Sequence, residues 1–134
     1  MAAATTNQTI EAQSKGVLVG GLVAASTTLY QGCMSFLASG FLTGTAGGNA
    51  FAGVNKNYVD NSAGSAGDKS AENFTEGVFY LSGSGFSQAS VGVKAYATDN
   101  NTVSVTSSSN SLVGTIVEYV SSTKVGIKID VQLA

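Results

Sequence analysis

The stretch Lys124-Val125-Gly126-Ile127-Lys128-Ile129-Asp130-Val131 decides the fold, because its apolar and polar residues alternate. Valine and isoleucine occupy one parity, while lysine, glycine and aspartate occupy the other. Successive side chains of a β-strand point to opposite faces of a sheet. The pattern therefore predicts a strand with one buried face, and it is the clearest such signal in the chain.

The residues before this stretch continue the strand pattern. Leu112–Val120 is apolar on both parities, which predicts a central strand. Asp99-Asn100-Asn101 has the chemistry of a hairpin turn, since Asp and Asn tolerate positive φ. Around this turn, one parity is apolar at Val91, Val93, Ala95 and Ala97, and again at Val103 and Val105. We therefore expect a strand on each side of the turn.

The first half of the chain gives weaker signals. Gly77–Leu81 is a continuous apolar run, which predicts a strand covered on both faces. Asn61–Ser70 consists almost wholly of turn formers and small residues, which predicts a loop. Three further candidate strands are Gly16–Ala24, Met34–Ala38 and Phe51–Val54.

Length and composition favour one β-rich domain. The chain has 134 residues, which is the length of a single domain, and its 17 glycines interrupt any helix. Residues 1–15 carry no strand or helix period, so we expect an extended N-terminal arm that is ordered only when something binds it. Residues 16–134 should form one all-β domain, as a small barrel or sandwich.

The residues that most enzymes use are missing. The chain has no histidine and no arginine, so it lacks the commonest general base and the bidentate clamp for phosphate. Cys33 is the only cysteine, which excludes an intrachain disulfide and predicts a small buried hydrophobic residue. Without a base, the serines of Ser107–Ser109 cannot be activated as nucleophiles. We expect no catalytic residue, no cofactor site and no enzyme activity.

A metal site is not expected either. Asp60 and Asp68, with Asn57 and Asn61 nearby, offer oxygen atoms, but their spacing is too wide for a calcium loop. We interpret them as solvated turn residues. Glu72 and Glu76 are the remaining pair of nearby carboxylates, and on a β-type segment they are expected to flank a strand rather than serve glycoside chemistry.

Charge and hydropathy exclude two kinds of partner. The six lysines are scattered and the net charge is −2, so the basic footprint of a nucleic-acid-binding protein is absent. Gly16–Ala25 is apolar, but Met1–Lys15 lacks the positive start of a targeting signal. Serine, threonine, glutamine and glycine then interrupt the apolar run that a spanning helix needs. We expect no nucleic acid and no membrane as partner.

Three blocks of sequence resemble a family of tailed-phage proteins associated with capsid cement, long known as a domain of unknown function. The first block is Phe51-Ala52-Gly53-Val54 followed by residues 57–68, the second is residues 76–81, and the third is residues 91–96 leading through Asp99 to residues 112–118 and 125–129. The order and spacing of these blocks match from about Thr27 to Leu133, whereas residues 1–25 do not match.

The resemblance implies a structural role and a location. A protein of this family decorates the phage head: it is made in the host cytoplasm, binds the outer surface of the capsid and bridges neighbouring major capsid proteins. Related decoration proteins commonly form homotrimers at three-fold positions, with a β-tulip or similar small-barrel fold. The resemblance thus implies the major capsid protein and the chain itself as partners.

An alternative class shares the Ser/Thr/Asn-rich composition. A secreted or surface β-domain for adhesion or glycan binding would normally carry a signal sequence and aromatic platforms, and this chain has no tryptophan. The two classes differ in their partner, which is a protein shell in one and a glycan in the other.

Overall fold

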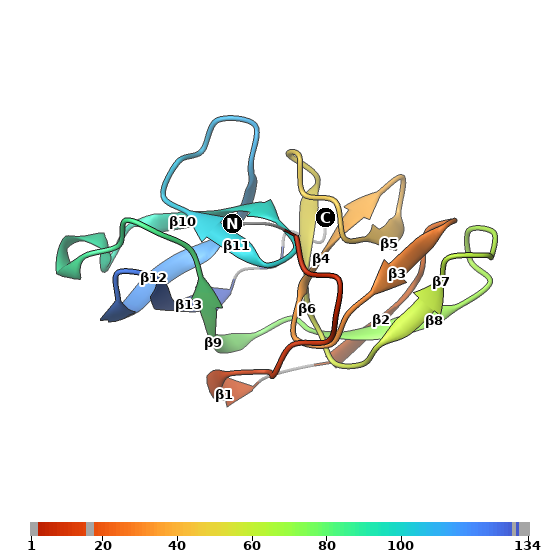
Figure 1. Cartoon of the computed structure of the whole chain (residues 1–134), viewed down its shortest axis with the longest axis horizontal. Helices are drawn as coiled ribbons and strands as arrows, with labels where there is room; N and C mark the ends of the chain where they lie inside the picture. Colours follow the sequence, from red (N-terminus) through yellow and green to blue (C-terminus); the bar gives the residue numbers. More distant parts are fainter. Residues whose placement is uncertain (1–2, 16–17, 130, 132–134) are drawn as a thin grey trace.

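The computed structural model describes residues 3–15, 18–129 and 131, which contain antiparallel strands in three sheets (Figure 1). The six-stranded sheet has the order β1 (Ala12–Lys15), β9 (Gly77–Ser82), β13 (Lys124–Ile129), β12 (Ser111–Ser121), β10 (Lys94–Asp99) and β11 (Thr102–Ser104). The five-stranded sheet has the order β2 (Leu18–Leu22), β8 (Ser70–Phe74), β6 (Ala50–Asn55), β4 (Met34–Ala38) and β5 (Phe41–Thr43). Strand β3 (Thr27–Leu29) pairs with β7 (Val59–Asn61).

The described residues contain no α-helix, and one short 3-10 helix, η1, spans Gln88–Ser90. The expected all-β class is therefore confirmed. Figure 1 shows the six-stranded and five-stranded sheets side by side along the long axis of the molecule.

One hydrophobic core joins the two large sheets. Phe36, Phe51 and Phe74 of the five-stranded sheet belong to the same buried cluster as Phe79 and Ile127 of the six-stranded sheet. The rings of Phe74 and Phe79 meet across the boundary with their centroids 5.7 Å apart. A fully buried apolar side chain stabilises a fold by about 1.5–3 kcal/mol, so this shared cluster holds the sheets together.

Each large sheet curls without closing. A single parallel bridge, Gly83 with Val103, joins the end of β9 to β11, and another, Val23 with Leu42, joins the end of β2 to β5. A closed barrel needs a continuous ladder at the seam, and these bridges supply one residue pair each. Of the two expected architectures, the sandwich-like one is consistent with the structure and the closed barrel is wrong.

Several of the expected elements are confirmed. Strand β4 has the predicted bounds, and Phe51–Val54 lies within β6. The predicted loop separates β7, which ends at Asn61, from β8, which begins at Ser70. The predicted turn joins β10 to β11, where the Asn101 N–H donates to Asp99 Oδ1 at 2.8 Å. Strand β12 is central as expected, with β10 on one side and β13 on the other.

Other expectations need correction. Val91 and Val93 lie outside β10 and are exposed, because η1 and the positive φ of Gly92 break the strand before Lys94. Val105 is also exposed, beyond the end of β11. Strand β9 is covered on one face only, since Phe79 and Leu81 are buried while its other residues stay partly exposed. The strand expected over Gly16–Ala24 is β2, and Gly16 and Val17 lie outside the described residues.

The final strand is shorter than the alternating pattern. β13 ends at Ile129, Val131 is partly buried against the core outside any strand, and Asp130 lies outside the described residues.

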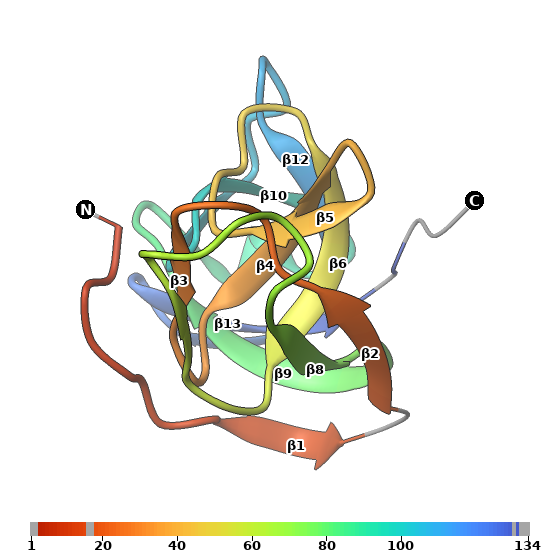
Figure 2. The same ribbon diagram turned by 90° about the vertical axis from the view of Figure 1, so that its right-hand side faces the viewer.

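The N-terminal arm contains a strand that the sequence did not indicate. Within the segment expected to be an extended arm, Ala12–Lys15 form β1, which pairs antiparallel with β9. Figures 1 and 2 show the segment before β1 running along the outside of the domain. Hydrogen bonds join it to the turns at Gln31 and Asn100. The pairing uses the main-chain groups of an edge strand, and such pairing requires no hydrophobic period.

Candidate functional site

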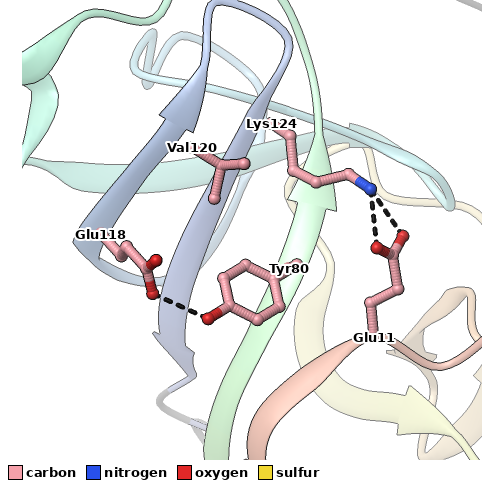
Figure 3. Close-up of a pocket in the computed structure, with 5 residues that line it drawn as sticks. All are labelled: Glu11, Tyr80, Glu118, Val120 and Lys124. Atoms are coloured by element: carbon pink, nitrogen blue, oxygen red, sulfur yellow. Dashed lines mark hydrogen bonds and ion pairs between the residues drawn. The ribbon is translucent and has the colours of Figure 1, made fainter.

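The outer face of the six-stranded sheet carries a row of residues in register across three strands. Gly126 of β13 is opposite Tyr80 of β9 on one side and Glu118 of β12 on the other. The missing side chain at Gly126 lets the Tyr80 ring lie across β13, since a Cβ there would be 3.1 Å from Cε1 of the ring. The Tyr80 hydroxyl donates to Glu118 Oε1 at 2.7 Å, which links β9 to β12 over the intervening strand (Figure 3).

An ion pair lies next to this row. Lys124 Nζ of β13 is 2.7 Å from both Oε1 and Oε2 of Glu11, which precedes β1 in the arm (Figure 3). Together with Val120, these side chains surround an open surface hollow of about 350 Å³, which we call the Tyr80 hollow. The arm therefore supplies part of this site, and the sheet supplies the rest.

The polar side chains of the hollow are paired across strands. The hydrogen bond to Glu118, followed by desolvation and the Glu118 charge, raises the pKa of Tyr80 above its ordinary value. The phenol therefore stays protonated at neutral pH and acts as a hydrogen-bond donor. The Lys124 ammonium is paired with the Glu11 carboxylate, and Val120 adds apolar surface to the lining.

The sequence did not single out the residues of this hollow. Glu11 and Tyr80 lie far in the chain from each other and from Glu118 and Lys124, and the pairing of the strands brings them together. The short-range signal that could have pointed to the site is Gly126, a glycine within an otherwise regular strand. Such a glycine often marks the close approach of another group.

A second surface feature is a group of three exposed valines, Val91, Val93 and Val117, which we call the valine ridge. Gly92 N–H donates to Ile116 O at 2.7 Å, and Ile116 N–H donates to Val93 O at 2.9 Å, so the two segments lie side by side. The three side chains are 37–42% exposed. Val117 sits at an irregularity in the pairing of β12 with β13, where the register shifts between Ile116 and Glu118.

A second hollow, of about 310 Å³, lies on the five-stranded sheet. Its lining is mostly apolar or glycine: Gly20, Gly21, Leu37, Gly40, Leu42, Ala52 and Asn73. The side chain of Asn73 is held by Ser35, whose hydroxyl donates to Asn73 Oδ1 at 2.8 Å. This buried polar pair stabilises the sheet beneath the hollow.

The loop around Asp60 and Asp68, between β7 and β8, is here called the acidic loop. It has a structural role that the sequence did not indicate. Asp60 and Asp68 bind main-chain N–H groups of Ser62 and Ser65, as turn residues do, and the bonds to Ser62 lower the pKa of Asp60. Asn61, in contrast, is buried, and its Nδ2 donates to the carbonyls of Ala24 and Ser65. Within the described residues, no group of three His, Cys, Asp or Glu side chains could hold a metal ion.

The remaining candidates have structural explanations. Glu72 lies on the exposed side of β8, 3.9 Å from Lys56, and Glu76 precedes β9 in the turn. Ser107–Ser109 lie in an exposed loop. Cys33 is buried as predicted, and burial followed by the charge of Asp99 raises the pKa of its thiol to about 11.

No helix in the described part of the chain is long and apolar enough to span a membrane. No family model, no curated protein and no solved structure matches the chain.

Proposed function

We propose that this protein is a decoration (cement) protein of a tailed-phage head, without catalytic activity. It would be made in the host cytoplasm, bind the outer surface of the capsid and stabilise contacts between neighbouring major capsid proteins. The observation that carries the proposal is the valine ridge. Exposed apolar side chains on two segments joined by main-chain hydrogen bonds are typical of surfaces that bind other proteins.

The arrangement of the resembling blocks is compatible with this role. The first block covers β6 to the loop after β7, the second includes β9, and the third runs from the segment before β10 to β13. All three blocks lie in the β-rich part of the chain. The sparse charge adds support, because closely packed subunits of low charge repel one another weakly.

A symmetric homotrimer at three-fold positions is the expected assembly. One small subunit offers a modest contact, whereas a specific stable interface buries at least about 1,000 Å² in total. Three linked subunits bind three capsid sites at once, so each later contact becomes effectively intramolecular. Averaged cryo-electron density of decorated shells tests the symmetry, and density for isolated monomers away from three-fold axes would refute it.

The test of the capsid role compares V117D with V105D. Both residues are exposed valines, but only Val117 belongs to the ridge, so V105D is the matched control. Burying an unpaired carboxylate in an apolar contact is costly, and we expect V117D to weaken decoration of purified shells at least tenfold, about 1.4 kcal/mol. Wild-type affinity of V117D, or absence of decoration by the wild-type chain, would refute the proposal.

Glycan binding by a surface β-domain is the second candidate, and the Tyr80 hollow is the observation that favours it. Sugars pack on aromatic rings and accept or donate hydrogen bonds at the rim. The Tyr80 hydroxyl and the Glu11 carboxylate are already paired, which lowers the hydrogen-bonding capacity left for a sugar. Calorimetric titration of the wild type and Y80A with a panel of oligosaccharides tests this alternative.

A further inference from the structure

The N-terminal arm, here residues 3–15, is attached to the domain at separate points along its length. At its start, Ala4 and Asn100 exchange two hydrogen bonds: the Ala4 N–H donates to Asn100 Oδ1 at 2.8 Å, and Asn100 Nδ2 donates to Ala4 O at 3.3 Å. Asn100 is 7% exposed and lies in the turn between β10 and β11. The turn therefore holds the arm by its main chain.

The middle of the arm binds the turn between β3 and β4. The Gln8 N–H donates to Gln31 O at 2.6 Å, and the Gln31 N–H donates to Asn7 Oδ1 at 3.0 Å. Gly32 has a positive φ, and a Cβ on it would meet the Gln8 carbonyl at 2.5 Å. The close approach of the arm thus requires a glycine at this position.

The end of the arm binds the six-stranded sheet. The Tyr80 N–H donates to Glu11 O at 2.8 Å, Lys124 pairs with the Glu11 carboxylate, and β1 continues the ladder along β9. We call the receiving residues Gln31, Gly32, Tyr80, Asn100 and Lys124 the arm-docking surface.

The arm contributes little to the core. Of the arm residues whose side chains are described, Ile10 alone packs against the hydrophobic cluster, and the buried members of that cluster all come from residue 34 onward. The arm is therefore held mainly by hydrogen bonds to main-chain groups and by one ion pair. An empty docking surface would leave the amide of Asn100 without its arm partner, and such a loss costs about 1–3 kcal/mol.

We propose that the arm-docking surface accepts residues 3–15 of a second copy of this chain, so that neighbouring subunits exchange arms. The contacts that hold the arm within one chain are the same contacts that would hold it between two chains. Exchange of an identical element between protomers is accordingly a low-cost route to association. Because the arm leads into β2 at Leu18, the exchange requires a neighbour whose β9 lies beside that strand.

The concentration of neighbouring subunits determines whether an arm binds its own domain or the domain of another chain. A short tether keeps the arm near its own docking surface at an effective concentration on the order of 1 mM. In dilute solution the intrachain state therefore prevails. When subunits crowd to a comparable density, as they would on a surface lattice, arms of neighbours compete on equal terms and link the subunits.

The exchange is tested by mixing two single-cysteine chains in a C33A background, one carrying E11C and the other K124C. In the folded domain these positions hold the paired atoms of Glu11 and Lys124, so a short bis-maleimide can join them. A cross-link between two chains then requires the arm of one on the domain of the other. The T45C chain replaces K124C in the control, since Thr45 is exposed and lies outside the arm-docking surface.

The E11C/K124C double variant at about 1 µM first verifies the fold, because it should give a linked product of one-chain size. At protein concentrations on the order of 1 mM, we expect the mixed single-cysteine chains to give several-fold more two-chain product than the control mixture. A synthetic peptide of residues 3–15 should suppress that product. Equal yields from the K124C and T45C mixtures, beside an efficient intrachain link in the double variant, would overturn the proposal.

The proposal does not rest on the capsid role, because the measurement uses the free protein. Loss of arm exchange with intact decoration, or the reverse, would separate the two conclusions.

Discussion

Replacing Gly83 with alanine tests how much the single bridge at the seam of the six-stranded sheet contributes to stability. Gly83 is joined to Val103 by an isolated parallel bridge. A Cβ on Gly83 would collide with the main-chain carbonyl of Val103 and would lie 2.7 Å from Cε2 of Phe86. The carbonyl belongs to the backbone and the Phe86 ring is buried, so neither can move away freely.

The expected cost has two parts. Forcing an extra methyl group into a packed site costs about 1–3 kcal/mol. Opening the seam also removes about one net main-chain hydrogen bond, worth about 1 kcal/mol. The G83A variant should therefore lose about 2–4 kcal/mol of its free energy of unfolding. Because a domain of this kind has about 5–15 kcal/mol in total, the variant should still fold.

Urea denaturation followed by circular dichroism measures this loss. With a slope of about 2 kcal/mol per M, the midpoint should fall by about 1–2 M. G20A is the matched control: Gly20 also lies in a strand, and the atom nearest its added Cβ, the Ala71 carbonyl oxygen, is 3.8 Å away. The control should change stability by less than about 0.5 kcal/mol. Equal midpoints for G83A and G20A would refute the role of the seam.

Three further measurements test the surroundings of the candidate sites. Because the bond to Glu118 raises the pKa of Tyr80, the stabilisation from that bond should be complete at neutral pH and be lost as the pH rises through the pKa of Tyr80; in absorbance titrations the Tyr80 phenol should ionise at higher pH in the wild type than in E118Q. Cys33, with a thiol pKa of about 11, should resist aromatic disulfide reagents at pH 8 in the native protein and react after unfolding in urea. G64A should loosen the acidic loop, because its Cβ would collide with the buried Oδ1 of Asn61, and limited proteolysis should then cut residues 61–70 faster than in the wild type.

The sequence predicted the strands well where burial of one face determines the backbone. β13 follows the alternation of valine and isoleucine, and β12 is central because apolar residues occupy both parities of its first half. A buried face imposes a fixed register, since a shift of one residue would place every apolar side chain in water. The hydrophobic pattern is then enough to locate the strand.

The predictions failed where main-chain geometry determines the structure. Val91 and Val93 have the parity of a strand, but the positive φ of Gly92 takes the segment out of the sheet and leaves both side chains exposed. Glycine adopts positive φ readily. The pattern of apolar residues does not show where the chain uses this conformation. The sequence pattern therefore did not predict that Val91 and Val93 are exposed and belong to the valine ridge, on which the proposed function rests.

The Tyr80 hollow could not be predicted for a related reason. Its members are joined by register across β9, β13 and β12, and register between distant strands follows from the whole fold rather than from local spacing. The register of β12 with β13 also shifts twice, once on each side of the Glu118 and Tyr119 pairs. These shifts change which β12 residues are opposite which β13 residues.

The arm shows the same limit most clearly, because its attachment uses almost no hydrophobic surface. Hydrogen bonds of its own main-chain groups hold it at Asn100, at Gln31 and along β9, and every residue except proline carries both a main-chain donor and an acceptor. A segment attached in this way leaves no periodic signal, yet it can bind any surface that presents the same donors and acceptors. The arm and the valine ridge, which the sequence patterns describe least, are thus the features on which the two proposals rest, while the well-predicted strands form the scaffold that presents them.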